Sequence, residues 1–247
     1  SDYCHDLLEL VQLYLKYHSQ PHPEIQKKAE EIDIEFLAKD LPKLLNSMKI
    51  GADRIRQLVL SLRNFSRLDE SDIKPVDIHE GIDSTLMILQ HRLKPKVGHS
   101  GIQIFKDYDN LPLVECYAGQ LNQVFMNLLS NAIDALEAKS RTEEKTEQIK
   151  SENSDELKIE ISTKILKNNL VRIKISDNAF GISPDVKARI FDPFFTTKEP
   201  GKGTGLGLAI SYQIIVQKHG GKLKCSSQLG ICTEFLIEIP VKQPIKN

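Results

Sequence analysis

The feature that most constrains the fold is an apolar stripe that runs from Ile34 to Leu62 in steps of four and three. Its members are Ile34, Ala38, Leu41, Leu45, Met48, Ala52, Ile55, Val59 and Leu62. This spacing places apolar side chains along one seam of a long α-helix, which needs a partner helix to cover it. A shorter stripe at Leu8, Val11 and Leu15 comes before it, and the segment SQPHPE, with two prolines, separates the two. The sequence therefore predicts a helical hairpin with an elaborated turn.

Two questions about this hairpin stay open at this point. Pro42 lies inside the second stripe, where it either kinks the helix or marks the first turn of a new one. The stripe fits an intermolecular bundle and equally a helical pair that caps the main domain within one monomer.

Length and composition favour two unequal domains in a soluble chain. The 247 residues are 40% hydrophobic, enough for an ordinary core, and a polar stretch, SDIKPVD, precedes a change of pattern. We expect a helical domain over residues 1–72 and a second domain over residues 73–247. A net charge of -1 with 27% charged residues gives no overall field toward nucleic acid or an anionic membrane.

Cysteine usage and hydropathy suggest a cytoplasmic location. Cys4, Cys116, Cys225 and Cys232 lie far apart without a CxxC pair, as expected of free thiols in a reducing compartment. No apolar run reaches the roughly 18 residues of a membrane helix, so no membrane contact is expected from this stretch. A membrane anchor elsewhere in a longer parent protein is compatible with these observations.

After residue 75 the pattern mixes helical and strand periodicities. Helices are expected at 78–92, 118–138 and 206–218, strands at 102–107, 157–163, 170–176, 221–227 and 233–239, and a polar surface loop between Ala138 and Leu157.

Two asparagines four residues apart, Asn127 and Asn131, fall on one face of the helix predicted at 118–138. Amide oxygens are hard, neutral ligands that suit Mg²⁺ and leave its charge available to phosphate oxygens. Taken alone, such a pair is more often helix surface or a cap.

The segment DNAFGIS follows directly on an apolar strand and places Asp177 and Gly181 where that strand opens into a loop. A carboxylate at this position can accept a hydrogen bond from the exocyclic amino group of adenine, and a glycine lets a flat base approach the backbone. The alternative is an ordinary Asx turn.

Four glycines alternate at Gly201, Gly203, Gly205 and Gly207, just before an apolar helix. Unhindered backbone NH groups at a helix start form an anion site, and Lys198 and Lys202 lie close enough in the sequence to add charge. A triphosphate would suit this site, although neither a Walker loop nor a full dinucleotide-binding fingerprint is present.

Together these motifs resemble the GHKL superfamily of Bergerat-fold ATPases, and within it the sensor histidine kinases, over about Pro75 to Pro240. NQVFMNLLSNAIDA resembles the N box, DNAFGI the first glycine box, IFDPFFTTK the F box and GKGTGLGLAI the second glycine box. Ala179 departs from the family, which usually has glycine there. The resemblance implies an α+β fold: a two-layer α/β sandwich preceded by the helical hairpin. It also implies that residues 1–72 are an incomplete dimerisation domain and that residues 73–247 are the catalytic ATP-binding domain.

The resemblance also implies roles by position. Asn131, with Asn127 as a second contact, matches the ligands of Mg²⁺, and Asp177 with Gly181 the adenine pocket. A lid over Gly181 to Thr204 is expected to order around ATP. The expected phosphate contacts are Lys198, Gly203, Thr204, Gly205, Leu206 and Gly207, and the expected catalytic residues are Asn127 and Lys198.

The ATP-hydrolysing relatives, namely gyrase, MutL and the heat-shock chaperone, place a glutamate where Asn127 stands. An amide cannot take a proton from water, so this site is expected to transfer the γ-phosphoryl group to a histidine of the dimerisation domain. No H box of the type HE-x-x-x-P precedes the N box, and His5, the one tempting candidate, lacks the following proline. The chain alone is therefore not expected to autophosphorylate. The other histidines, including His219, are expected to be structural or solvent-facing.

The implied partners are a second copy of the chain in the full-length kinase and the receiver domain of a response regulator. One alternative is a GHKL serine kinase of the anti-sigma factor type. The other is a nucleotide-gated interaction module in which lid ordering exposes or hides a surface.

Overall fold

The computed structural model describes residues 2–17, 22–65, 72–95, 101–145, 156–199 and 203–243. The chain divides into two compact units, Ser1–Val59 and Leu60–Asn247. The division falls inside a continuous helix, and the expectation that an independent domain begins near residue 73 stays a prediction.

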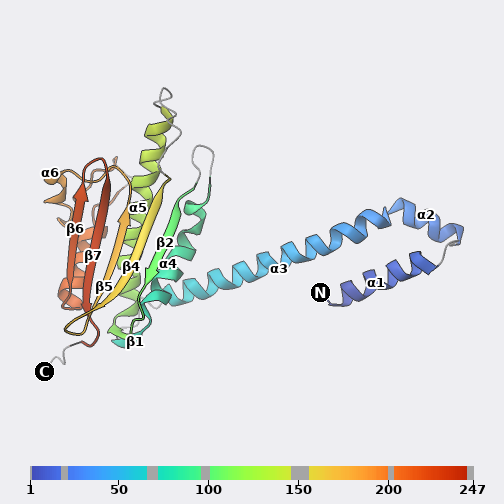
Figure 1. Cartoon of the computed structure of the whole chain (residues 1–247), viewed down its shortest axis with the longest axis horizontal. Coiled ribbons are helices and arrows are strands. Elements are labelled where there is room, and N and C mark those ends of the chain that lie inside the picture. The colour runs from blue at the N-terminus through green and yellow to red at the C-terminus, as the bar shows by residue number, and fades with distance from the viewer. Residues whose placement is uncertain are drawn as a thin grey trace. The chain divides into compact units, whose positions relative to one another are not determined.

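The first unit contains helices α1 (Asp2–Tyr17), α2 (Pro23–Glu31) and most of α3 (Ile34–Phe65), which form the elaborated hairpin (Figure 1). His22 caps α2, since its Nδ1 accepts a hydrogen bond from the Glu24 backbone NH at 3.4 Å. Asp33 interrupts the helical backbone between α2 and α3 with a φ of 47°. Its carboxylate accepts a hydrogen bond from the Phe36 NH at 3.2 Å. The turn therefore holds a short helix of its own.

Pro42 lies within α3, which runs continuously past it. The alternative that a new helix begins at Pro42 is therefore wrong, because the first turn of α3 starts at Ile34, directly after Asp33. A proline removes one backbone donor from the helix, and the hydrogen bonds on either side are enough to continue it.

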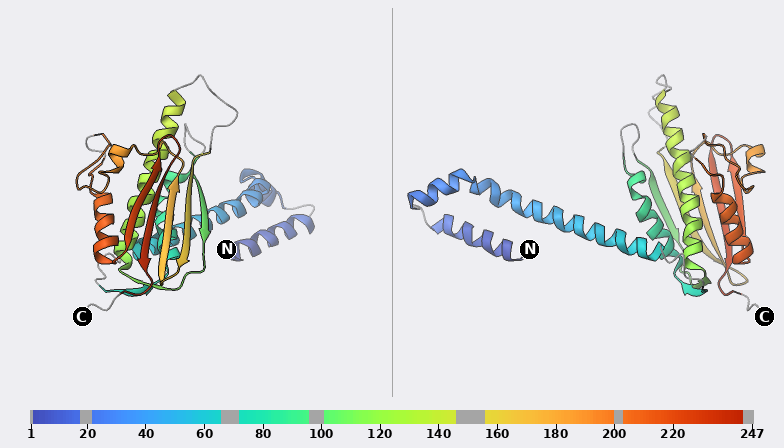
Figure 2. Two further views of the ribbon diagram at one scale, coloured as in Figure 1. Left: turned by 60° about the vertical axis from the view of Figure 1, so that its left-hand side comes forward. Right: turned by 180° about the vertical axis from the view of Figure 1, so that it is seen from behind.

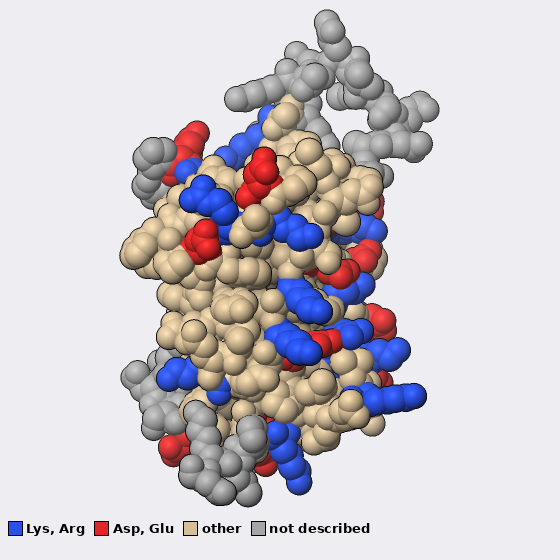
Figure 3. Space-filling model, turned by 90° about the vertical axis from the view of Figure 1, so that its left-hand side faces the viewer, with Lys and Arg blue, Asp and Glu red and all other residues tan. Residues whose placement is uncertain are grey.

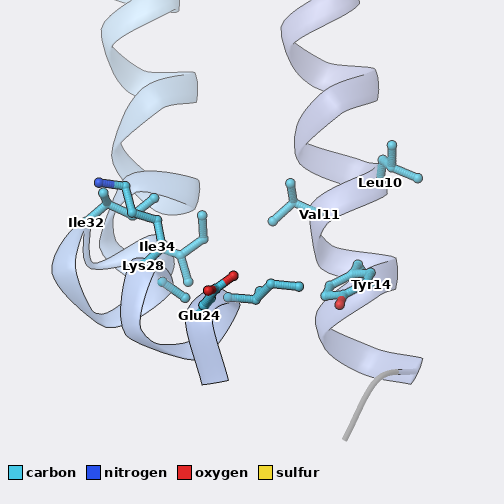
Figure 4. Close-up of a pocket in the computed structure, with 9 residues that line it drawn as sticks. Leu10, Val11, Tyr14, Glu24, Lys28, Ile32 and Ile34 are labelled. Carbon is cyan, nitrogen blue, oxygen red and sulfur yellow. The ribbon is translucent and has the colours of Figure 1, made fainter. Parts of the chain in front are cut away.

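Between α1 and the region of α2 and the start of α3 lies a hollow of about 570 Å³. Val11 and Tyr14 lie on one side of it and Lys28 and Ile34 on the other (Figure 4). The rest of the lining comes from Leu10, Glu24, Ile25, Ala29 and Ile32. Met48, a member of the long apolar stripe, is 68% exposed, so the described residues leave this part of the stripe uncovered.

The second unit contains one large and one small sheet. Its elements are β1 (Lys74–Val76), α4 (Ile78–Leu93), β2 (Gln103–Tyr108), β3 (Val114–Cys116), α5 (Ala118–Lys145), β4 (Lys158–Leu166), β5 (Leu170–Asp177), α6 (Pro184–Lys187), α7 (Gly207–Tyr212), the π-helix η2 (Gln213–Lys218), β6 (Lys222–Gln228) and β7 (Cys232–Pro240). The large sheet has the order β2-β4-β5-β7-β6, in which β2 pairs with β4 in parallel and the other pairs are antiparallel. β1 and β3 form a separate antiparallel pair.

Helices α4, α5 and α7 cover one face of the large sheet, and the core lies between these two layers (Figures 1 and 2). Alternate residues of the central strands point into this core, as the register of Ile161, Ile175 and Phe235 across β4, β5 and β7 shows. The opposite face carries polar residues, including the pair Arg172–Glu238 at 2.6 Å. The predicted two-layer α+β sandwich is confirmed.

Three local features differ from the expectation. Helix α5 continues to Lys145 rather than ending at Ala138, so the predicted loop begins later; residues 146–155 lie outside the described part of the chain. The helix expected at 206–218 divides into α7 and η2. The pair β1–β3 and the short α6 were not predicted, because three or four residues carry too little periodicity.

His219 links the end of η2 to the start of α5 and is fully buried. Its Nδ1 donates to the Ile214 carbonyl at 2.8 Å, and its Nε2 accepts from the Tyr117 NH at 3.1 Å. Only a neutral imidazole can make both bonds, because the protonated ring has no acceptor. Burial lowers the pKa of His219 below 6.5, although the bond to Ile214 acts in the opposite direction. The predicted structural role of this histidine fits its position.

We predict that acid weakens the contribution of His219 to stability. Its pKa is lowered in the folded state, so the unfolded chain binds the proton more readily, and the contribution is complete above pH 6.5 and falls as the pH drops below that value. The expected loss is at most about 1.4 kcal/mol per pH unit. Urea unfolding from pH 7.5 to 5.5 gives the difference in free energy of unfolding between the wild type and His219→Gln. A difference that does not change with pH would contradict the prediction.

Candidate functional site

Asn127 of α5 is fastened to the start of α7. Its Nδ2 donates to the Gly207 carbonyl at 2.9 Å and to Ser211 Oγ at 3.1 Å. Gly207 lies directly against this amide, since a Cβ there would be in ordinary van der Waals contact with Asn127 Cγ at 3.4 Å. The structure thus brings together two residues that the sequence placed in separate motifs.

Asn131, one turn further along α5, contacts Lys198. The lysine Nζ donates to Asn131 Oδ1 at 3.3 Å and also forms an ion pair with Asp134. These contacts connect α5 with the segment that contains Lys198.

Asp134 and its partner Arg92 were missed by the sequence reasoning. Arg92 of α4 reaches Asp134 Oδ1 at 2.5 Å and Glu137 Oε2 at 2.8 Å. Burial alone would raise the pKa of Asp134, but the Lys198 ammonium and the Arg92 guanidinium hold it below its ordinary value. Asp134 is three residues after Asn131 on the same helix face, a spacing that could have identified it; nothing in the sequence pointed to Arg92.

Asp177 ends strand β5 with a carboxylate that is almost fully buried. One oxygen accepts a hydrogen bond from the Ala179 NH at 3.0 Å, so the Asx turn considered for this residue is present. Burial raises the pKa of Asp177 to about 6, although the Ala179 NH and Lys139 act in the opposite direction. The turn engages one of the two oxygens, and a carboxylate can accept further hydrogen bonds from a ligand.

Gly181 has a φ of 69° and lies against the turn between β6 and β7. A Cβ on Gly181 would lie 2.8 Å from the carbonyl carbon of Gln228 and closer still to its oxygen. Ala179 is buried, so the family departure at this position is accommodated within the core.

The second glycine segment is described from Gly203 onward, and Gly201 and Lys202 lie outside the described residues. Gly205 has a φ of 66°, and a Cβ on it would lie 2.6 Å from the Phe194 carbonyl oxygen. Thr204 Oγ1 accepts a hydrogen bond from the Leu206 NH at 3.4 Å, immediately before α7 begins at Gly207. The glycines therefore allow the segment to pass against the F box without side-chain overlap.

Within the described ranges of the chain, no group of three or more His, Cys, Asp or Glu side chains is placed to hold a metal ion. Within the same ranges, no helix combines the length and apolar character needed to cross a bilayer.

A family model described as histidine kinase-, DNA gyrase B- and HSP90-like ATPase matches residues 117–243, just over half of the chain. The chain belongs to this ATPase family. The match includes every predicted site residue from Asn127 to Gly207.

Named relatives of this ATPase domain are sensor kinases. The sensor kinase CckA of Brucella abortus (strain 2308) is 34% identical over 199 residues, 81% of this chain and 20% of CckA. The catalytic domain of histidine kinase ThkA is 28% identical with a TM-score of 0.54, covering 69% of this chain and 97% of that one. Full-length ShkA in complex with AMPPNP is 25% identical with a TM-score of 0.54, covering 81% of this chain and 38% of that one. This chain therefore spans about a fifth of the length of CckA.

These likenesses confirm the predicted resemblance to the ATP-binding catalytic region of sensor histidine kinases.

We predict that Gly181→Ala destabilises the ATPase domain more than Gly230→Ala. Both glycines have a positive φ, at 69° and 80°, which disfavours any other residue by about 1–2 kcal/mol. A Cβ on Gly230 meets nothing within 4 Å, whereas one on Gly181 overlaps the Gln228 carbonyl. The expected additional loss is about 1–3 kcal/mol in urea unfolding. Equal losses for the two variants would contradict the proposed steric role of Gly181.

Proposed function

We propose that this chain is the catalytic part of a sensor histidine kinase that transfers the γ-phosphoryl group of ATP to a histidine of the dimerisation domain in its parent protein. The observation that carries the proposal is a pair of contacts made by α5: Asn127 donates to the Gly207 carbonyl, and Asn131 accepts from Lys198. These residues come from the N box, the F box and the second glycine box, and the side chains of Asn127, Asn131 and Lys198 suit a metal–triphosphate ligand.

The neutral amides fit a magnesium ion that is shared with phosphates. Asn131 and Asn127 would hold Mg²⁺ through their Oδ1 atoms, and the bound ion would neutralise developing charge on the phosphates. Lys198, Gly203, Thr204, Gly205, Leu206 and Gly207 would contact the phosphates. Asp177 would accept a hydrogen bond from the amino group of adenine, with Gly181 beside the base.

Asn127 is the residue that favours transfer over hydrolysis. An amide nitrogen that already donates to Gly207 and Ser211 cannot remove a proton from water. The acceptor must therefore bring its own nucleophile, and an imidazole attacks directly as a nucleophile. We propose that the acceptor histidine lies outside this chain, because no H box occurs within it.

The proposed partners follow from the first unit and from a relative. Leu10, Leu37 and Met48 are exposed apolar residues on helices of the first unit, and a second copy of the chain in the full-length kinase would cover them. ThkA has been solved in complex with the response regulator TrrA, and we propose a response regulator receiver domain as the partner here as well. We also propose a cytoplasmic location for this region, with any membrane anchor elsewhere in the parent protein.

The proposal predicts acid-labile phosphate on a longer chain that restores upstream residues, and none on this chain alone. Both chains would be incubated with labelled ATP and Mg²⁺, separately and mixed. The longer chain carries Asn131→Ala in the mixture, so label on it must come from the catalytic domain of the shorter chain. Asn131→Ala in both chains is the control.

Acid-labile label on the short chain alone would make His5 or another of its histidines the acceptor. Acid-stable label on a separate protein would favour a serine kinase. Tight ATP binding without any label would favour a nucleotide-gated module.

We also predict that ATP affinity falls in acid, because Asp177 must be ionised to accept a hydrogen bond from the adenine amino group. Its pKa of about 6 in the empty site means that the carboxylate is ionised above that pH and protonated below it. Affinity is expected to drop by at most about tenfold per pH unit below pH 6. Calorimetry measures the ATP affinity from pH 7.5 to 5.0. The Asp177→Asn variant is measured at the same pH values, so that the effect of protonating the nucleotide itself can be subtracted. A wild-type profile that matches that of Asp177→Asn would contradict the assignment.

A further inference from the structure

The Lys198 ammonium is hydrogen-bonded to Asn131 Oδ1, the oxygen atom that the proposed metal ion would need. Its Nζ lies 3.3 Å from Asn131 Oδ1 and pairs with the carboxylate of Asp134. The pair is only partly screened by solvent, since the side chains of Lys198 and Asp134 are 37% and 32% exposed. A second cation on Asn131 Oδ1 would be repelled by this ammonium, so Lys198 must leave before a divalent ion can bind there.

Asp134 does not lose all its partners when Lys198 leaves. Arg92 holds Asp134 Oδ1 at 2.5 Å, while Lys198 contacts Oδ2, the other oxygen of the same carboxylate. Arg92 is itself anchored to Glu137 at 2.8 Å, so it stays at the surface of α5 whichever position the lysine takes. The carboxylate is therefore fixed from one side and can release the lysine on the other.

We propose that Asp134 is a positioning residue that holds Lys198 on Asn131 in the empty site and releases it to the phosphates when the metal–nucleotide complex enters. The inference rests on the proposed ATP site and adds to it a residue without an assigned role. Partly exposed ion pairs of this kind change equilibria by about two- to fivefold, which a triphosphate with several negative charges can overcome. Asp134 thus lowers the affinity for nucleotide modestly and keeps Lys198 close to where it will contact the phosphates.

The experiment measures the affinity for ATP with Mg²⁺ by calorimetry in four forms: wild type, Asp134→Asn, Lys198→Gln and the double variant. Glu238→Gln is the control, because it removes a partly buried ion pair with Arg172 on the open face of the sheet. Asp134→Asn is expected to bind ATP about two- to fivefold more tightly, and Lys198→Gln several-fold more weakly. In the Lys198→Gln background, Asp134→Asn should change the affinity by less than twofold. Unfolding curves of all forms establish that they are folded.

Two results in the affinity measurement would overturn the inference. Weaker binding by Asp134→Asn would make the carboxylate a ligand of the metal or nucleotide. Equal tightening with and without Lys198 would mean that Asp134 acts by repelling phosphate rather than by holding the lysine.

A second measurement on the nucleotide-free protein separates this inference from the proposed function. Trypsin cleaves after Lys198 and also after Arg189, an exposed residue of the same lid segment that serves as the internal reference. Cleavage after Lys198 relative to Arg189 is expected to rise several-fold in Asp134→Asn, because the lysine side chain is released. An unchanged ratio would overturn the inference. A wild type that binds no ATP would refute the proposed function, and the tryptic ratio would still decide whether Asp134 holds the lysine.

Discussion

Helix α5 packs against the inner face of the sheet through side chains that are almost completely excluded from solvent, and the rest of the site depends on this contact. Phe125, Leu128 and Leu129 are each at most 1% exposed. Asn127 and Asn131 fall at helical positions between and beyond them. Rotating α5 enough to redirect either amide would uncover these apolar residues, at about 1.5–3 kcal/mol for each. The direction of the two amides is thus a consequence of core packing.

The interactions on the outer side of α5 are of another kind. Lys198, Asp134 and Arg92 meet at partly exposed positions, where an ion pair contributes about 0.2–1 kcal/mol. The core that positions the asparagines is therefore far stronger than the contacts that hold the lid segment beside them. This difference allows the charged groups to exchange partners without disturbing the scaffold, which a site that must admit and release a highly charged ligand requires.

The sequence was informative where residues close in the chain define the structure. Asn127 and Asn131 were found because a spacing of four residues places them on one helix face. Contacts between distant segments left no such signal: Arg92 and Asp134 are 42 residues apart on separate helices. The end of α5 was placed too early because its last residues are polar without periodicity, yet Lys, Arg and Glu are good helix formers on an exposed helix. Tertiary placement, rather than element type, was what the pattern could not supply.

Helix α5 also connects the two ends of the proposed ligand site. Asn127 is bonded to the Gly207 carbonyl, and Lys139 donates to the Asn178 carbonyl at 2.9 Å, next to Asp177. These anchors are twelve residues apart, or about 18 Å along the helix axis. Because one rigid element holds both the carboxylate end and the glycine end, their separation does not depend on the segment between Gly181 and Thr204. That segment can therefore change its contacts around a ligand while the two ends of the site stay at a fixed distance.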